Sequence, residues 1–320
     1  MHKYRQALPQ MRDGFFLTDG GIETTLIFLE GQDLPYFAAF HLLGTPDGES
    51  ALRKYFRTYA ELAQKHQCGL VLETATWRAS ADWGNQLGYS REALAEANRK
   101  SVRLLEEIRM AYETPQTPIV ISGCVGPRGD GYVPGNKMSV EQAQDYHGSQ
   151  IGTFAGSAAD LATAITMNYV EEAVGLARAA KNAALPVVIS FTVETDGKLP
   201  TGQSLGEAIA QVDDATSGYP AYFMINCAHP THFSGVVGKD EPWRARIHGL
   251  RANASTMSHT ELNNAPELDA GNPVELGQDY AALKRQHLKS LNVFGGCCGT
   301  DHRHVEQIAL ACLPLHRAAA

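Results

Sequence analysis

The sequence predicts a single α/β domain over residues 1–320, folded as a (β/α)8 TIM barrel. Three observations predict this fold: short apolar runs alternate with helix-like segments, eight such runs are present, and the length is somewhat above the roughly 250 residues typical of the barrel. The chain contains no low-complexity linker and no short repeat, which favours one domain. An open doubly wound sheet is the alternative fold.

Eight runs rich in apolar and β-branched residues are predicted as strands. In chain order they are FFLTD (15–19), GLVLE (69–73), PIVISG (118–123), DLATAIT (160–166), LPVVISF (185–191), AYFMIN (221–226), ARIHGL (245–250) and LNVFGG (291–296). Their near-continuous apolar character is typical of strands that are buried on both faces, as in a parallel sheet.

Amphipathic segments lie between these strands. Apolar residues recur at three- and four-residue intervals in SALRKYFRTYAELAQKHQ (50–67), SREALAEANRKSVRLLEEIRMAYE (90–113) and YVEEAVGLARAAKNAAL (169–185). The Gly- and Pro-rich stretch PRGDGYVPGNK (127–137) is predicted as a long loop after the third strand. Its glycines lack the spacing of a phosphate-binding loop, so a plain or lid-like loop is favoured over nucleotide binding.

The charge balance limits the classes of partner. The chain carries 27 basic and 35 acidic residues, a net charge of -8, which argues against nucleic acid and anionic membrane and favours a small-molecule ligand. No apolar run approaches the roughly 20 residues of a membrane span, and the first residues lack the apolar stretch of a signal peptide, so we expect a cytoplasmic protein. The composition leaves oligomerisation open.

Six cysteines are too few for a disulfide scaffold in a chain of this length, so their positions carry the information. Cys227 directly follows the sixth predicted strand, and Cys297 and Cys298 directly follow the eighth, where flanking glycines allow the chain to turn sharply. The carboxyl ends of barrel strands meet at one mouth. Three converging thiolates match a catalytic zinc site with an open fourth position. Core packing and a redox-active vicinal pair are the alternatives.

The remaining cysteines and the nearby histidines are expected to have other roles. Cys68 and Cys312 lie in helix-like apolar patterns and are predicted to be core residues, and packing is also favoured for Cys124 after the third strand. Thr300 and Asp301 resemble the cap of a last helix. Surface or capping roles are therefore favoured over metal binding for His229, His302 and His304.

With these strand-end cysteines the sequence resembles the homocysteine S-methyltransferase family, a group of zinc-dependent (β/α)8 barrels. The resemblance covers most of the chain through LTDGGIETTL (17–26), LETATWRAS (72–80), SGCVGP (122–127), ISFTVETDGKLPTGQSL (189–205), INCAHP (225–230) and GGCCGT (295–300). The last two motifs are the most specific, because a single cysteine followed some 70 residues later by GGCC is the zinc signature of the family. The resemblance implies that the zinc ligands are Cys227, Cys297 and Cys298.

The same resemblance implies an amino-acid pocket beside the metal. Asp19, with the adjacent Gly20 backbone, matches the residue that helps to hold the homocysteine amino group, and Glu73 and Thr76 match a second patch of that pocket. A turn residue is the alternative role for Asp19, and a helix cap is the alternative for Thr76. Because Glu73 ends an apolar strand, we expect its carboxylate to meet a cation or several hydrogen-bond donors.

Three positions depart from the family pattern. Many relatives carry a Glu-Thr pair after the fourth strand, where this chain has Ile165 and Thr166. Ala75 replaces an asparagine of the second-strand motif, and Cys124 replaces a small residue such as serine. We therefore expect the pocket to differ from that of the family at the end that binds the amino-acid part of the acceptor.

The resemblance implies zinc-dependent transfer of a methyl group to the thiol of homocysteine, giving methionine. Zinc deprotonates a bound thiol, so no general base is needed. S-methylmethionine or S-adenosylmethionine is the expected donor, with betaine behind them, and the absence of a separate adenosylmethionine-binding domain favours S-methylmethionine. The alternatives are methylation of another thiol or of a selenol, and a zinc or redox protein that binds thiols without turning them over.

Overall fold

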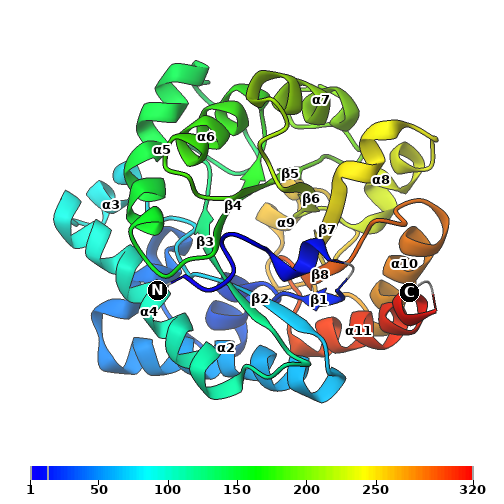
Figure 1. Cartoon of the computed structure of the whole chain (residues 1–320), viewed down its shortest axis with the longest axis horizontal. Helices are drawn as coiled ribbons and strands as arrows, with labels where there is room; N and C mark the ends of the chain where they lie inside the picture. The colour runs from blue at the N-terminus through cyan, green and yellow to red at the C-terminus, as the bar shows by residue number, and fades with distance from the viewer. Residues whose placement is uncertain (1, 13, 319–320) are drawn as a thin grey trace.

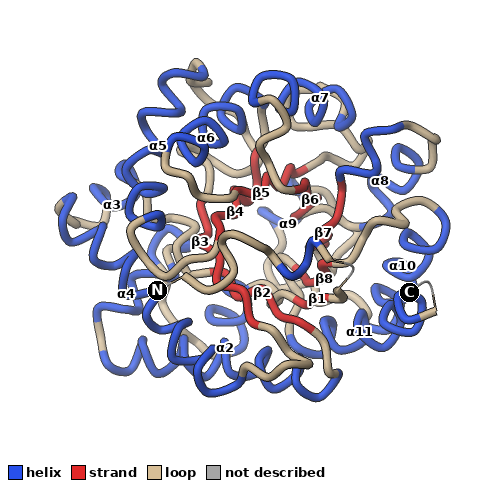
Figure 2. Tube along the Cα trace, viewed as in Figure 1, coloured by secondary structure: helices blue, strands red, loops and turns tan. Residues whose placement is uncertain are grey.

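The structure, a computed structural model, describes residues 2–12 and 14–318. Within these residues eight parallel strands close into a barrel in chain order, and β8 pairs with β1 (Figures 1 and 2). The strands are β1 (Phe16–Leu17), β2 (Gly69–Glu73), β3 (Ile119–Val125), β4 (Leu161–Met167), β5 (Val187–Thr192), β6 (Tyr222–Asn226), β7 (Ile247–Ala252) and β8 (Val293–Gly296). The TIM barrel and all eight predicted strand positions are confirmed, and the open sheet is wrong.

Helices form the outer layer around the barrel, as Figure 1 shows. The long ones are α2 (Pro46–His66), α4 (Arg91–Tyr112), α5 (Val140–Ala155), α6 (Val170–Asn182), α7 (Leu205–Thr216), α8 (Pro230–Val237), α10 (Pro273–Gln286) and α11 (His302–Arg317). Three shorter helices, α1 (Ile22–Thr24), α3 (Ala81–Gln86) and α9 (His259–Asn264), lie in loops that follow strands. The three predicted amphipathic segments are confirmed as α2, α4 and α6.

Capping residues in the sequence fix where several helices begin. The side chains of Thr45 and Ser90 accept hydrogen bonds from backbone N–H groups in the first turns of α2 and α4. Ser139 and Ser204 form capping boxes with Gln142 and Glu207 at the starts of α5 and α7. These caps satisfy N–H groups that a helix leaves unpaired at its start, and they set the lengths of the loops at the barrel mouth.

The barrel interior is filled at its amino-terminal end. Side chains from seven of the strands and from Leu8 form a compact apolar cluster there, which includes Phe16, Val71, Tyr222 and Met224. A larger apolar cluster fills the space between the strands and the surrounding helices. Because the lower interior is closed, the space for a ligand lies at the carboxyl ends of the strands.

The structure agrees with the roles predicted for two cysteines and for the Gly- and Pro-rich stretch. Cys68 and Cys312 are buried in the larger apolar cluster, which confirms their core role, and burial raises the pKa of each thiol to about 12. Residues 127–137 form a loop without helix or strand. Across the part of the chain that the structure describes, no helix is both long and apolar enough to cross a membrane.

Candidate metal centre and acceptor pocket

Three cysteine sulfurs converge at the mouth of the barrel. Cys227 follows β6, Cys297 and Cys298 follow β8, and their sulfur atoms all lie within 4.8 Å of one another. A tetrahedral zinc site with Zn–S bonds of about 2.3 Å places its sulfurs about 3.8 Å apart, so small side-chain adjustments bring the cluster to this geometry. Among the described residues this is the one group of three or more potential ligands that lies so close together.

The backbone bends at both strand ends to bring these sulfurs together. Cys227 has a left-handed φ of 53°, which is costly for a residue other than glycine, and His259 Nε2 lies 2.5 Å from its carbonyl oxygen. After β8 the chain turns through Gly299, whose φ is 79°, while the Thr300 N–H and hydroxyl both donate to the Cys297 carbonyl. The adjacent cysteines are therefore in a turn and can face one ion.

One thiolate charge is shared within the cluster. Hydrogen bonds from the thiols of Cys297 and Cys298 hold the pKa of Cys227 well below its usual value, although burial opposes this. The same contacts raise the pKa values of Cys297 and Cys298. Cys227 is therefore the thiolate of the cluster, and a bound divalent cation would favour deprotonation of the other two thiols as well.

Tyr132, from the loop between β3 and α5, covers the cluster. Its hydroxyl donates to Cys227 Sγ at 3.5 Å and lies 3.7 Å from Cys298 Sγ, and its ring centroid is 4.1 Å from that of His259. Burial is the main cause that raises the pKa of the Tyr132 hydroxyl, and the nearby cysteines add to the increase. The sequence predicted the loop, but no spacing or motif indicated that this tyrosine reaches the metal centre.

A cavity of about 430 Å³ lies above the three cysteines, which form part of its lining. The strand ends and their loops supply the other walls. Residues of differing chemistry face this space, including Asp19, Glu23, Trp77, Arg78, Tyr132 and Ile165. A volume of this order is typical of small-molecule sites.

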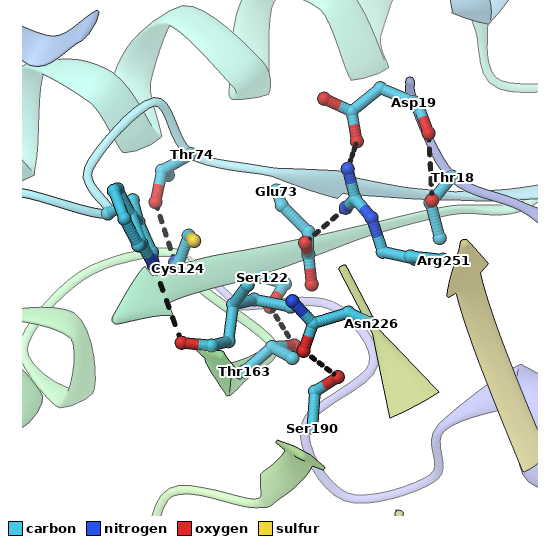
Figure 3. Close-up of polar contacts among 12 residues, drawn as sticks. Thr18, Asp19, Glu73, Thr74, Ser122, Cys124, Thr163, Ser190, Asn226 and Arg251 are labelled. Carbon is cyan, nitrogen blue, oxygen red and sulfur yellow. Dashed lines mark hydrogen bonds and ion pairs between the residues drawn. The ribbon is translucent and has the colours of Figure 1, made fainter. Parts of the chain in front are cut away.

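Asp19, Glu73 and Arg251 form a buried ion-pair triad, which Figure 3 shows, and all three residues line the cavity. Arg251, near the end of β7, lies between two carboxylates: its Nη2 is 2.7 Å from Asp19 Oδ1, and its Nη1 donates to Glu73 Oε2. Its guanidinium also donates to the carbonyls of Gly20 and Gly296, at 3.0 Å each. The cation expected beside Glu73 is confirmed, and it is Arg251.

Both carboxylates of the triad pair with Arg251, and Asp19 has a further partner. The second oxygen of Asp19 accepts a hydrogen bond from the Tyr55 hydroxyl at 3.0 Å. Burial raises the pKa values of Asp19 and Glu73, while the guanidinium charge of Arg251 opposes this. Two carboxylates and one guanidinium leave one net negative charge in the wall when all three are ionised.

The end of β2 is tied to the end of β3 by threonines. Thr76 is fully buried, and its hydroxyl donates to the Cys124 carbonyl at 2.7 Å. The Thr74 hydroxyl accepts from the Cys124 N–H and, unlike Thr76, lines the cavity. Helix α3 is preceded by Ser80, so the cap alternative for Thr76 is wrong. Cys124 lines the cavity but lies outside the group of metal ligands.

The wall at β4 is apolar, as the sequence departure suggested. Ile165 lines the cavity with 8% of its surface exposed, and its carbonyl accepts from the Trp77 indole at 3.4 Å. The register of β4 against β5 shifts between Ala164 and Met167, and Thr166 has a left-handed φ of 66°. This irregularity is held by Asn226, which bonds both the backbone and the hydroxyl of Thr166.

The predicted helix cap and the histidines have structural roles. Asp301 caps α11 by accepting from the Arg303 N–H, and His304 completes the capping box. His229 caps α8 in the same way, and His302 is exposed in the first turn of α11. The surface or capping roles expected for these histidines are confirmed.

The closed barrel and the thiol cluster at its mouth define the class of protein: a TIM barrel whose three cysteines are consistent with a metal site. Residues 16–312 match the family model of homocysteine S-methyltransferase, and the chain belongs to this family. It is an enzyme of the homocysteine S-methyltransferase type, as the resemblance implied.

Several relatives are similar over most of their length. A selenocysteine Se-methyltransferase of Brassica oleracea var. italica is 26% identical, over 92% of this chain and 88% of the relative. Homocysteine S-methyltransferase 2 of Arabidopsis thaliana is 22% identical, over 92% of both chains. The metallated form of the homocysteine methyltransferase MmuM from Escherichia coli has the same fold, with a TM-score of 0.71, 19% identity, and coverage of 95% of this chain and 98% of that one.

Proposed function

We propose that the protein transfers a methyl group to the thiol of homocysteine, giving methionine, with zinc bound by the three cysteines. S-methylmethionine or S-adenosylmethionine is the proposed donor. The convergence of three thiols on the floor of a cavity of about 430 Å³ is the observation that carries the proposal. The family and the name of the Arabidopsis relative support homocysteine as the acceptor.

The residues present fit zinc in number and chemistry. Three thiolates leave the fourth position of a tetrahedral ion open for an acceptor sulfur. Bound zinc would keep that sulfur deprotonated at neutral pH, where a free thiol with a pKa near 8.5 is mostly protonated. The thiol proton can leave to solvent, so the site needs no general base.

The charges around the cavity favour a cationic methyl donor. The three cysteines and the wall formed by Asp19, Glu73 and Arg251 are both negative, and a sulfonium about 4 Å from a unit negative charge gains roughly 4 kcal/mol at an effective dielectric of 20. This attraction weakens as the methyl group leaves the sulfonium, so it favours binding more than reaction. Alignment of the two sulfurs within the cavity is what lowers the barrier.

The amino-acid end of the acceptor is proposed to lie against the wall at β1 and β2. Asp19, Gly20 and Glu73 line the cavity, and Arg251 fixes the positions of both carboxylates. Thr76 contributes from behind this wall, through its bond to the Cys124 carbonyl. The net negative charge of the triad favours the ammonium group of an amino acid.

A panel of acceptors and donors tests the proposal. Purified protein is incubated with homocysteine, selenocysteine or other thiols and with S-methylmethionine, S-adenosylmethionine or betaine, and the products are identified by mass spectrometry. Methionine formed from homocysteine with a sulfonium donor is the expected result. Transfer to selenocysteine alone would identify a selenol methyltransferase, as the name of the Brassica relative suggests.

Metal content tests the site independently of turnover. We expect about one zinc per chain in the purified protein and loss of most of it when any ligand cysteine is replaced by serine. Cys312→Ser is the matched control, because this buried cysteine lies in α11 away from the cluster and should leave zinc unchanged. Full zinc in all three ligand variants would contradict the metal site. Zinc-free protein with a reversible Cys297–Cys298 disulfide would favour the redox alternative.

A further inference from the structure

Glu23 is a cavity carboxylate whose charge has no cationic partner among the described residues. It lies in α1, directly after the glycines that follow β1, and its side chain is partly exposed to the cavity. Asp19 and Glu73, in contrast, are buried and share Arg251. Of these three carboxylates, Glu23 is therefore the one that is available to a ligand.

The segment that carries Glu23 is fixed against the turn of the metal cysteines. A side chain at Gly21 would lie 2.5 Å from the Cys297 carbonyl oxygen, so the backbones pack closely there. On the other side of Glu23, the Thr24 hydroxyl accepts from the Gly299 N–H at 3.1 Å. These two contacts hold Glu23 beside the metal centre, within the short reach of an amino acid whose sulfur is bound there.

The surroundings of Glu23 favour a positively charged ligand. Burial raises the pKa of Glu23 to about 7, and the nearby Asp19 and Cys227 add to the increase, while its own backbone N–H and Arg251 oppose it. Arg251 is already shared by two other carboxylates. An ammonium group from a ligand would neutralise Glu23 at small additional cost, because much of the desolvation of the carboxylate has already occurred.

Arg78 supplies the complementary charge in the same cavity. Its guanidinium lies between the rings of Trp77 and Trp83, 3.9 Å from each centroid, and donates to the Gly129 carbonyl. Only 6% of Arg78 is exposed, and its Nε has no hydrogen-bond partner among the described residues. Burial lowers the pKa of the Arg78 guanidinium to about 10, and the charges of Asp130 and then Glu23 oppose this. Arg78 and Glu23 line the same cavity and form no ion pair within the described chain, so each can pair with a ligand.

We propose that Glu23 binds the ammonium and Arg78 the carboxylate of an α-amino-acid acceptor whose thiol is methylated at the cysteine cluster. This inference rests on the proposed function and adds the two residues that distinguish an amino-acid thiol from other thiols. The Asp19–Glu73–Arg251 wall then acts through its shape and net charge, and Ile165 needs no carboxylate to complete the pocket.

Three thiols that differ in one group each test the inference. Homocysteine, 4-mercaptobutanoate without the ammonium, and 3-aminopropanethiol without the carboxylate are titrated into zinc-loaded protein by calorimetry. Glu23→Gln should weaken homocysteine binding about tenfold or more, the effect expected for loss of a hydrogen bond between charged groups, and leave 4-mercaptobutanoate nearly unchanged. Arg78→Gln should weaken homocysteine and 4-mercaptobutanoate but not 3-aminopropanethiol.

Glu267→Gln is the matched control, because Glu267 lines the same cavity but is exposed to solvent. It should leave all three affinities within about twofold. Zinc content and thermal midpoint are measured for each variant, so that a folding defect is recognised. Unchanged homocysteine affinity in zinc-replete Glu23→Gln would overturn the inference while leaving thiol methylation intact. Failure of all three thiols to bind the wild-type protein would overturn the proposed function and the inference with it.

Discussion

Replacement of Arg251 by glutamine should destabilise the barrel because it leaves two buried carboxylates without their cation. In the structure the guanidinium lies 2.7 Å from Asp19 Oδ1, donates to Glu73, and bonds the carbonyls of Gly20 and Gly296. Residues from β1, β2, β7 and β8 therefore lose a common contact in this variant. The side chain of Arg251 has little contact with solvent, so water cannot replace these bonds freely.

The expected cost is about 3–5 kcal/mol, the range for removing one partner of a buried ion pair. The two pairs share one guanidinium, so their losses do not simply add. Burial already raises the pKa values of Asp19 and Glu73, and without Arg251 they rise further. A carboxyl group with a raised pKa in the folded state destabilises that state when it is ionised, so the defect should be largest near pH 8 and smaller near pH 5.

Urea denaturation, followed by circular dichroism, measures this effect. Because a barrel of this size can unfold through intermediates, the midpoint of the first transition is compared between the variant and the wild type. The matched control is the triple variant Asp19→Asn, Glu73→Gln, Arg251→Gln, which removes the charges together and should recover much of the lost stability. A single variant within about 0.5 kcal/mol of the wild type would refute the reasoning. So would a triple variant that is less stable than the single one.

Two further predictions concern ligand binding. Ile165→Glu should lower the thermal midpoint and should not tighten homocysteine binding, because it places a carboxylate without a cation at an apolar wall. A tenfold gain in homocysteine affinity, measured by calorimetry, would contradict this and would place the ammonium beside β4. The affinity of the wild type for homocysteine should decrease as the pH is lowered through about 7, because Glu23 becomes protonated there. Burial, Asp19 and Cys227 raise the pKa of Glu23, and Arg251 opposes this increase. This additional loss should be absent in Glu23→Gln, and identical pH profiles for both proteins would contradict it.

The fold was predictable because its signals are local. Each apolar strand and each amphipathic helix is recognisable within about 20 residues, and the regular alternation of the two defines the barrel. The convergence of three cysteines was predictable for a related reason: a residue that directly follows a parallel strand must lie at the mouth. Placement and the flanking glycines were enough to predict that Cys227, Cys297 and Cys298 meet, whereas their role as zinc ligands was implied by the family resemblance.

The contacts that shape the pocket were not predictable from the sequence because they join distant residues. Arg251 and Glu73 are separated by 178 positions, and Tyr132 and Cys298 by 166. The predicted seventh strand ended at Leu250, one residue before the arginine that completes the wall. The available signal was Glu73, a charged residue at the end of an apolar strand. It indicated that a buried cation lies nearby, but it did not identify that cation as Arg251.

Glu23 illustrates a second limit. It belongs to the motif LTDGGIETTL, in which the sequence singled out Asp19 and Gly20. In the structure Asp19 is paired with Arg251, whereas Glu23 faces the cavity. This difference depends on the three-residue helix α1 and on the close approach of Gly21 to Cys297. No periodicity specifies so short an element.

The pairing of β1 with β8 has a consequence for how the protein is made. Phe16 pairs with Val293, so the barrel closes only when segments from opposite ends of the sequence are both available. At about 5–20 residues per second, Cys227 emerges several seconds before Cys297 and Cys298. The newly synthesised chain therefore offers one of the three thiols for most of that interval, and the three-cysteine cluster can form only after synthesis of the last strand. A ligand that needs all three sulfurs would in this way distinguish a chain that has made β8 from one interrupted before it.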